Sequence, residues 1–297
     1  MKESMALRSL IEPDNIIDAG DSPIEPNQWS TLEVSLCGTE TRAIACRSVA
    51  PLRMVSSRLS GKTCHVRVSQ YGGGMVDGDH VSLRVACRKS SRLMMSSVGN
   101  LQVYKSNLKG CSQRIVGEVE EGALAVVAPD PVVLHADSIY RSSQEWHVHS
   151  RASLIVAELM IGGRIENGER FLFQEYSGDF LIFLDEKPVF RDSFRFVPAI
   201  NNYRDPATFA GRSHMLSVFL IGAMCHHMAD LLTSEAIRLR TIPGATILSS
   251  LYPLERFGYV MRAVSNTTAE LDAIIDLMHS VLKDSSFLGF NSRERKY

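Results

Sequence analysis

The feature that most constrains this chain is a long succession of short apolar runs that begins at Trp29. In several runs apolar and polar residues alternate, as at Val81, Leu83 and Val85, which are separated by single polar residues. Successive side chains of a β-strand point to opposite faces, so this alternation indicates strands with one buried face. Clusters of Gly, Asp and Asn separate the runs at roughly ten-residue spacing, which is typical of a sandwich, a barrel or a coiled β-structure. No internal repeat stands out.

The C-terminal third of the chain carries a helical pattern instead. Apolar residues recur at helical spacing from Leu271 to Leu282 and form one stripe, which predicts a helix over 267–283. Thr267 and Glu270 fit a capping box at its start. A second helix is predicted near 223–240. The fold class expected is therefore mainly β, a coiled or sandwich-like domain with a few C-terminal α-helices.

The first 28 residues differ from the rest of the chain. They are polar, contain Pro13, Pro23 and Pro26, and lack periodicity, which predicts a flexible N-terminal extension. Residues 29–297 are then expected to form a single β-rich domain, long enough to bury a sizeable core.

Composition excludes several classes of function. Lys+Arg 32 and Asp+Glu 33 give a net charge of −1, so no global basic field attracts nucleic acid. The apolar runs are too short to cross a membrane, and the first residues show no secretory signal. The six cysteines contain no Cys-x-x-Cys pair and are expected to be reduced thiols. These features predict a cytoplasmic protein that binds neither nucleic acid nor membrane.

Few residues in the sequence suggest metal chemistry. His147 and His149 are two residues apart, so they share one face if their segment is a strand, and histidine binds nickel and other transition metals. The alternative, which we favour, is a solvated strand face. No metal ligand is therefore assigned, and these two histidines are weak candidates.

A glycine-rich segment carries a resemblance to a known family. Tyr71-Gly72-Gly73-Gly74-Met75-Val76-Asp77-Gly78-Asp79 resembles the Gly-Gly-Gly-Leu-Val-x-Gly-Asp signature of the UreD/UreH urease accessory proteins. Such a run demands backbone freedom, because glycine accepts positive φ and permits close approach of chains. Further segments resemble family motifs in the same order: Ala50-Pro51-Leu52-Arg53, Val103-Tyr104-Lys105-Ser106, Pro129-Asp130-Pro131-Val132, Gly163-Arg164, Gly168-Glu169-Arg170-Phe171, Arg191-Asp192 and Val260-Met261-Arg262.

The resemblance spans about Trp29 to Phe290 and departs from the family pattern at two positions. The family usually has Thr-Thr-Gln-Gly where this chain has Ser96-Ser97-Val98-Gly99, and a Lys where this chain has Gln102. At position 98 the polar amide of the family's usual Gln is therefore replaced by the apolar side chain of Val98. At position 102 the positive charge of the family's usual Lys is replaced by the neutral side chain of Gln102.

The resemblance implies a fold and a function. The family fold is a coiled, mostly β structure with a few helices, and its members are scaffolds, not enzymes. UreD-type proteins form a complex with UreF, expected here as 2:2, which recruits the GTPase UreG and docks on the urease apoprotein. No tightly bound cofactor is implied, and nickel(II) is a transient passenger on an internal route.

The resemblance also gives candidate roles to residues. Asp79 is either a polar wall residue of an internal passage or a residue that caps the turn. Arg164 and Glu169 form either a buried ion pair or a surface pair. The structural turn itself is assigned to four glycines, Gly72, Gly73, Gly74 and Gly78.

Two other functions compete with the scaffold. A β-fold metalloenzyme would use His147, His149 and carboxylates, and would hold one tightly bound metal with an open coordination position. A generic interaction module would bind partners without any effect on urease.

Overall fold

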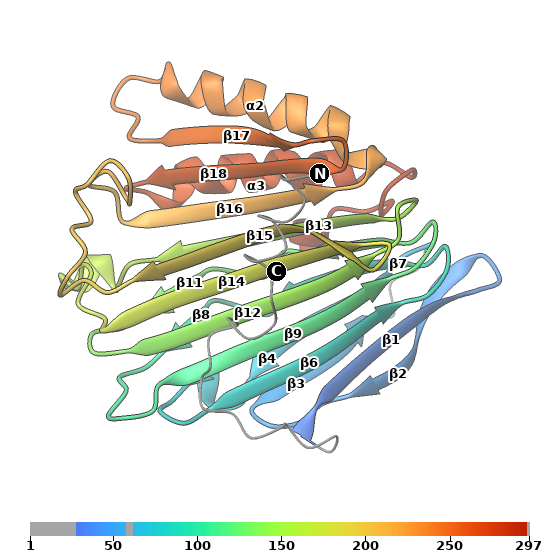
Figure 1. Ribbon diagram of the computed structural model, residues 1–297, viewed down its shortest axis with the longest axis horizontal. Coiled ribbons are helices and arrows are strands. Elements are labelled where there is room, and N and C mark those ends of the chain that lie inside the picture. Colours follow the sequence, from blue (N-terminus) through green and yellow to red (C-terminus); the bar gives the residue numbers. More distant parts are fainter. Residues whose placement is uncertain (1–27, 58–61, 296–297) are drawn as a thin grey trace, which may run out of the picture.

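The computed structural model describes residues 28–57 and 62–295, and its architecture is two long β-sheets with two α-helices on one side (Figure 1). The expected extension, apart from Gln28, lies outside the described residues. The first sheet has seven strands, in the order β15 (Lys187–Phe196), β14 (Glu175–Leu184), β12 (Ile139–Val148), β9 (Cys111–Val119), β6 (His80–Cys87), β1 (Ser30–Cys37) and β2 (Glu40–Arg47). The second sheet follows the order β17 (Leu248–Leu254), β18 (Gly258–Ser265), β16 (His214–Ile221), β13 (Ser153–Ile161), β10 (Leu124–Val127), β7 (Arg92–Ser97), β4 (Cys64–Gln70) and β3 (Leu52–Ser57). Three short strands branch from it: β5 (Gly74–Met75), β8 (Leu101–Val103) and β11 (Val132–Leu134).

The centre of the fold is a coil in which the chain passes from one sheet to the other and back. From β4 to β14 each strand pairs in parallel with the corresponding strand of the next turn, as β6 does with β9 and β7 with β10. The short strands β5, β8 and β11 pair in parallel at the corners. Hydrogen bonds between equivalent corners join residues 33 apart, such as Asp130 with Ser97 and Ile139 with Ser106. The coil is a structural repeat that the sequence does not reveal, because its turns share backbone geometry and not residue identities.

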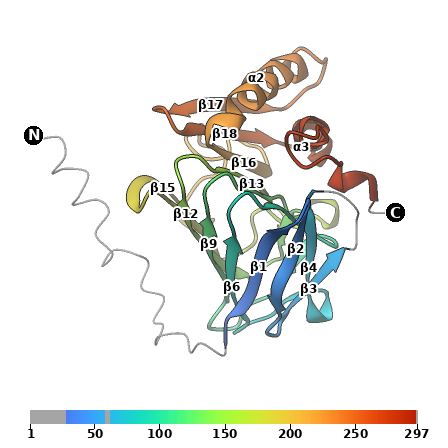
Figure 2. The ribbon, with the colours of Figure 1, turned by 90° about the vertical axis from the view of Figure 1, so that its right-hand side faces the viewer.

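Antiparallel strands extend the coil at both ends. Strands β2 and β3 pair with β1 and β4, and β15 pairs with β14. Beyond β13, the strands β16, β18 and β17 continue the second sheet, and β16 still faces β14 of the first sheet, where Phe219 stacks on Phe180 (Figure 2). Helices α2 (His226–Arg240) and α3 (Thr268–Leu282) lie against this part of the second sheet, so the molecule has three layers at that end.

Two apolar clusters hold these layers together. The first lies between the two sheets and includes Leu83, Trp146 and Phe219. The second lies between the second sheet and the helices, where Leu232 of α2 and Ile274 of α3 meet side chains of β13, β16 and β18. Strand β13 is therefore buried on both faces, which explains its nearly continuous apolar sequence.

The expected fold class is confirmed: the protein is mainly β, and its two α-helices fall at the expected places near 223–240 and 267–283. The capping box expected at the start of the helix over 267–283 was wrong. Thr267 makes no side-chain hydrogen bond to α3, so the predicted capping box does not form. Glu270 instead accepts hydrogen bonds from the backbone N–H and the hydroxyl of Thr246, each at 2.7 Å, and another from Ser265. Within the described ranges, no helix is both long and apolar enough to cross a membrane.

Candidate functional site

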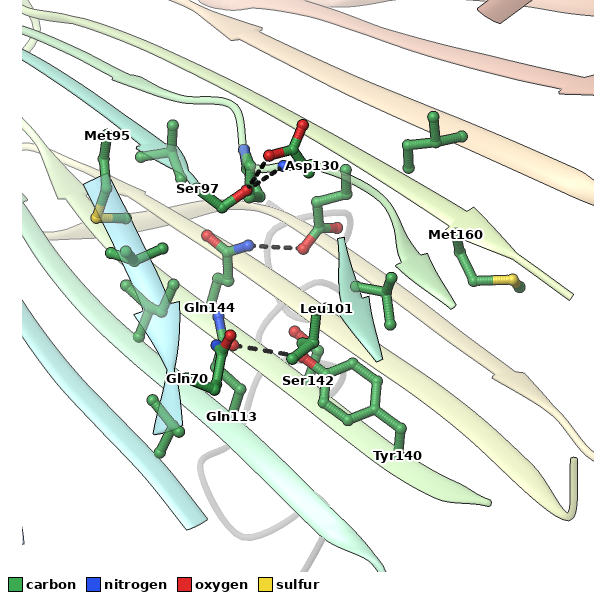
Figure 3. A pocket seen from close by; sticks show the side chains of 18 of the residues that line it. Gln70, Met95, Ser97, Leu101, Gln113, Asp130, Tyr140, Ser142, Gln144 and Met160 are labelled. Carbon is green, nitrogen blue, oxygen red and sulfur yellow. Dashed lines mark hydrogen bonds between the residues drawn. The ribbon is translucent and has the colours of Figure 1, made fainter. Parts of the chain in front are cut away.

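A cavity of about 80 Å³ lies between the two sheets, inside the coil (Figure 3). Strands of both sheets contribute to its wall, because every second side chain of each strand points inward. A water molecule needs roughly 10–15 Å³ of such space, so the cavity can hold several. Its polar lining includes six side chains: Ser97, Gln113, Asp130, Ser142, Gln144 and Glu158.

Strand β12 carries several of the polar side chains that line the cavity. Its inward positions are taken by Tyr140, Ser142, Gln144 and Trp146, and all but Trp146 line the cavity. The inner face of a strand in a two-sheet core is ordinarily apolar, so Ser142 and Gln144 interrupt that pattern. The interruption makes this part of the interior polar.

Glu158 is the charged residue at the centre of the site. It lies on β13, between the inward apolar residues Val156 and Met160. The Gln144 side chain crosses from the opposite sheet, and its Nε2–H donates to Oε1 of Glu158 at 2.6 Å. Trp146 in turn donates its indole N–H to Oε1 of Gln144 at 2.9 Å. A carboxylate this deep in a protein core is costly unless it is hydrogen-bonded, and this network supplies such a bond.

The environment of Glu158 changes its titration. Burial raises the pKa of this carboxyl, and Asp192 nearby acts in the same direction, while the Gln144 hydrogen bond and the Arg262 guanidinium oppose them. The net pKa lies above the ordinary value for glutamate. The side chain still has some accessible surface, because it faces the cavity. Tyr140 and Tyr176 are buried beside it, and burial raises the pKa of both phenols, which therefore stay neutral.

The second carboxylate of the cavity lies at a corner of the coil. Ser97 donates its hydroxyl to Oδ2 of Asp130 at 2.7 Å and accepts the backbone N–H of Asp130 at 2.6 Å. Asp130 is half-buried, and Gly99, which also lines the cavity, is exposed. The cavity therefore comes close to the surface at this corner, with Asp130 near its edge.

The polar side chains of the cavity supply oxygen atoms of three kinds, from carboxylates, hydroxyls and amides. Oxygen atoms of these kinds are hard ligands, and they bind divalent transition-metal cations with lower affinity than a set of cysteine and histidine ligands does. In the part of the chain that the structure describes, no three His, Cys, Asp or Glu side chains come together as a metal site.

The four glycines assigned to the structural turn lie at a corner next to the short strands. Gly72, Gly73 and Gly78 have φ values of 76°, 76° and 89°, in the region that favours glycine. Gly74 begins β5 and is buried against Tyr104 and Gln102 of the next turn of the coil. The motif thus shapes a corner of the coil, outside the cavity lining.

Asp79 lies in this turn and not on the cavity wall. Its Oδ2 accepts the backbone N–H of Val76 at 2.8 Å, as in a turn-capping aspartate. Its neighbour Asp77 accepts backbone N–H groups of Lys109 and Gly110 and so ties two turns of the coil together. Of the two roles left open for Asp79, the geometry is that of the turn cap.

Arg164 and Glu169 are paired at the surface. The Arg164 Nε lies 2.9 Å from Oε2 of Glu169, but the Arg164 side chain is 43% exposed, so the pair is not buried. Glu169 also accepts the N–H of Ala136 at 3.3 Å. The alternative of a buried ion pair is therefore wrong for this chain, because the loop that carries Arg164 lies at the outside of the coil.

The two histidines offer no metal site in this arrangement. Nε2 of His147 lies 3.0 Å from Glu145 and Nδ1 lies 3.2 Å from Glu186, so both ring nitrogens face carboxylates. A ring that donates from both nitrogens is an imidazolium without a lone pair for a metal. His149 accepts the backbone N–H of Arg151 through Nδ1.

The two departures from the family pattern lie near the cavity corner. Val98 follows Ser97 and is 63% exposed. Gln102 accepts a hydrogen bond from Nε2 of His135 at 2.8 Å, on the side of the short strands. Neither side chain lines the cavity.

Sequence reasoning did not single out Glu158, although a signal was present. Glu158 is the sole charged residue in the segment Ser153–Ile161, which is otherwise apolar except for Ser153. Gln144 was a second indication of a polar interior site. It is separated from Tyr140 and Trp146 by even numbers of residues, so it lies on the same face of the strand as these aromatic residues. A charge and an amide on faces that should be buried are the pattern that predicts a polar interior site.

Comparison with known proteins finds one family and several relatives of this chain. Residues 29–296 match the family described as UreD urease accessory protein. The chain is 34% identical over 200 residues to the urease accessory protein UreD of Cytophaga hutchinsonii, covering 67% of this chain and 70% of the relative. It is 27% identical over 224 residues to that of Anaeromyxobacter sp., covering 75% of each chain. The match to that of Paenarthrobacter aurescens is 23% identical over 295 residues, covering 96% of this chain and 99% of the relative.

The fold and the cavity define a class of mainly β proteins whose coiled sheets enclose a partly polar interior. Because the family match covers nearly the whole of the described chain, the particular family is also clear. The chain belongs to the UreD urease accessory protein family.

Proposed function

We propose that the chain is a non-catalytic scaffold of urease maturation that passes nickel(II) to the urease apoprotein through its internal cavity. Family membership supports the accessory role. The observation that carries the proposed route is the Glu158 carboxylate, which lies inside the coil and faces a cavity that can hold several water molecules. Asp130, at the corner where the cavity nears the surface, is the corresponding carboxylate at the entrance or exit.

The chemistry of the lining supports transfer over storage. Nickel(II) binds carboxylate, hydroxyl and amide oxygens, but holds them less tightly than a set of imidazoles or thiolates. Ser97, Asp130, Ser142, Gln144 and Glu158 supply oxygens of these three kinds. A nickel ion would replace one or two of its water ligands with these oxygen atoms at a time. Because it would keep its other water ligands, it could dissociate from the cavity again.

The proposed partners are UreF, in a 2:2 complex, together with UreG and the urease apoprotein, all acting in the cytoplasm. Exposed apolar side chains at the corners beside the short strands, among them Tyr71, Val76, Val98 and Leu108, support a protein-binding role for that end of the coil. The six cysteines, all described, are free thiols, in keeping with a reducing compartment.

The test is urease activity in cells that express apo-urease, UreF, UreG and a nickel supply, with or without this chain. Activity is expected to appear only with the chain present. Glu158→Gln keeps the shape of the side chain and removes its charge, so activated urease should fall by roughly tenfold, the loss of one charged contact. Glu166→Gln, the same change on the exposed helical turn Ile165–Asn167, is the matched control and should leave activation unchanged.

The outcomes separate the scaffold from its competitors. Equal activity with and without the chain would remove the accessory role. A chain that co-purifies with UreF but never activates urease would be an interaction module only. Full activation by Glu158→Gln would leave the accessory role standing and exclude the route past Glu158.

A further inference from the structure

A chain of hydrogen bonds crosses the interior from one sheet to the other and ends on Glu158. It starts at the indole of Trp146, passes through the amide of Gln144, and reaches the carboxylate on the opposite sheet. Trp146 and Gln144 are two residues apart on β12, so both point inward, and both are buried. Figure 3 shows the Gln144 amide reaching across the cavity.

The indole sits in a place shaped to receive it. Gly117 of β9 faces the ring, and a Cβ at that position would lie 2.1 Å from the ring carbon Cε3 of Trp146. The ring is fully buried, so its position is fixed by packing on all sides. The direction of its N–H is therefore fixed as well.

The identity of each donor and acceptor decides the orientation of the amide. An indole N–H can only donate, so the oxygen of the Gln144 amide must face Trp146. The NH₂ end then necessarily faces Glu158. If the amide turned over, its oxygen would meet the carboxylate oxygen of Glu158, and two acceptors would face each other at hydrogen-bond distance.

In this orientation of the amide, only one carboxylate oxygen of Glu158 accepts a hydrogen bond from the described residues. Oε1 accepts from Gln144, while no hydrogen bond from the described residues reaches Oε2. The charged and titratable groups that face Glu158 are Arg262 of β18, Asp192 of β15, and the phenols Tyr140 and Tyr176. Arg262 is itself ion-paired with Asp192, so neither replaces Gln144 as the direct partner of the carboxylate.

We infer that Trp146 is a positioning residue for the passage of a divalent cation: its N–H fixes the Gln144 amide, which holds Glu158 with one carboxylate oxygen free for the ion. The inference rests on the proposed function, since it concerns the same cavity. A carboxylate held in this way contacts an ion through one oxygen, which favours release over retention.

The test measures activation of apo-urease, in the reconstituted complex, as a function of nickel(II) chloride concentration. Trp146→Phe keeps an aromatic ring and removes the N–H. It should raise the nickel concentration for half-maximal activation about fivefold, the effect of one lost hydrogen bond, and leave the maximum unchanged. Trp29→Phe changes the other tryptophan, which is buried outside the cavity beneath Arg84, and is the matched control.

A coupling experiment shows whether Trp146 acts through Gln144. Gln144→Met should raise the half-maximal nickel concentration at least as much as Trp146→Phe. In the double variant, Trp146→Phe should add nothing, because residues that act in series are not additive. If Trp146→Phe does not fold, Trp146→Tyr, which also lacks the indole N–H, replaces it in both measurements.

Two results would overturn the inference. In the first, the tryptophan variant lowers the maximum without moving the half-maximal concentration, as a merely structural role would. In the second, its effect adds fully to that of Gln144→Met. If Glu158→Gln impairs activation while Trp146→Phe behaves as wild type, only the positioning role fails. If Glu158→Gln has no effect, the proposed route fails first.

Discussion

At the scale of single residues, the glycines of the turn meet two different demands. Gly72 needs only a backbone conformation, because its φ is 76° and a Cβ there would meet open space. Gly74 has an extended backbone but needs room, since a Cβ would lie 2.4 Å from the carbonyl oxygen of Gln102. One glycine is therefore required by torsion and the other by the close approach of two turns of the coil.

This difference predicts unequal costs for alanine. Gly72→Ala should lower the free energy of unfolding by about 1–2 kcal/mol, the cost of a left-handed residue. Gly74→Ala should cost more, because backbone atoms of β5 and β8 must move apart. Chemical denaturation of both variants measures the two values. Equal losses, or a smaller loss for Gly74→Ala, would show that the two turns do not pack as described.

The residue scale also shows what sequence reasoning can and cannot find. The glycine run predicted the turn, because glycine is the residue that most readily adopts a positive φ, and this preference can be recognised in the sequence without knowing the fold. Glu158 and Gln144 are 14 residues apart and meet only because the coil places β13 opposite β12. Asp79 and Arg164 were given alternatives that only their surroundings could decide.

At the scale of elements, strand β12 has two different faces. Its inner face carries Gln144 into the cavity, and its outer face carries His147 beside the hairpin of β14 and β15. The tip of that hairpin is Asp185-Glu186, both with positive φ, and Glu186 reaches His147. The ring of His147 also stacks on Phe183, with centroids 4.5 Å apart. The histidine therefore ties the hairpin to the coil.

This arrangement predicts a pH-dependent stability. Burial lowers the pKa of His147, but Glu145 and Glu186 outweigh it, so the pKa lies above its ordinary value of about 6.5. A group with a raised folded pKa contributes its full stability below the unfolded pKa and loses it as pH rises through the folded pKa. The melting temperature of His147→Gln should thus fall below wild type at pH 6, and the gap should narrow by pH 9. A gap that stays constant across this range would contradict the paired imidazolium.

The helices were predicted well and their caps poorly, for a physical reason. The apolar stripe of α3 is local, so its period alone indicated the helix. The partner of Glu270 is Thr246, 24 residues away, and no local pattern could reveal it. Tertiary hydrogen bonds took the place of the expected capping box.

At the scale of the whole molecule, alternation predicted strands but not their connection. The parallel pairs, such as Tyr140 with Cys111 and with Tyr176, join residues of different turns, and the turns share no residue pattern. Alternation equally allowed a sandwich or a barrel. The interior cavity follows from the coil, since the coil places the inward faces of β12 and β13 opposite each other.

The molecule as a whole is expected to be stable without metal. Because the cores are apolar and no metal cluster forms among the residues placed in the structure, EDTA should leave the melting temperature of the purified protein unchanged. Scanning calorimetry before and after dialysis against EDTA measures this. A clear drop in melting temperature, reversed by one equivalent of metal, would favour the metalloenzyme alternative.

The central claim is that nickel passes through the cavity, and the most direct measurement is the nickel content of urease matured with a plugged cavity. Ser142→Phe fills the space beside Gln144, whereas Ser143→Phe places the same bulk on the outer face of β12. Overpacking costs roughly 1–3 kcal/mol, so co-purification with UreF and the melting temperature of both variants are recorded first. Urease matured with Ser142→Phe should contain little nickel, and urease matured with Ser143→Phe should contain as much as with wild type. Full nickel loading with a folded, complex-forming Ser142→Phe would contradict passage through the cavity.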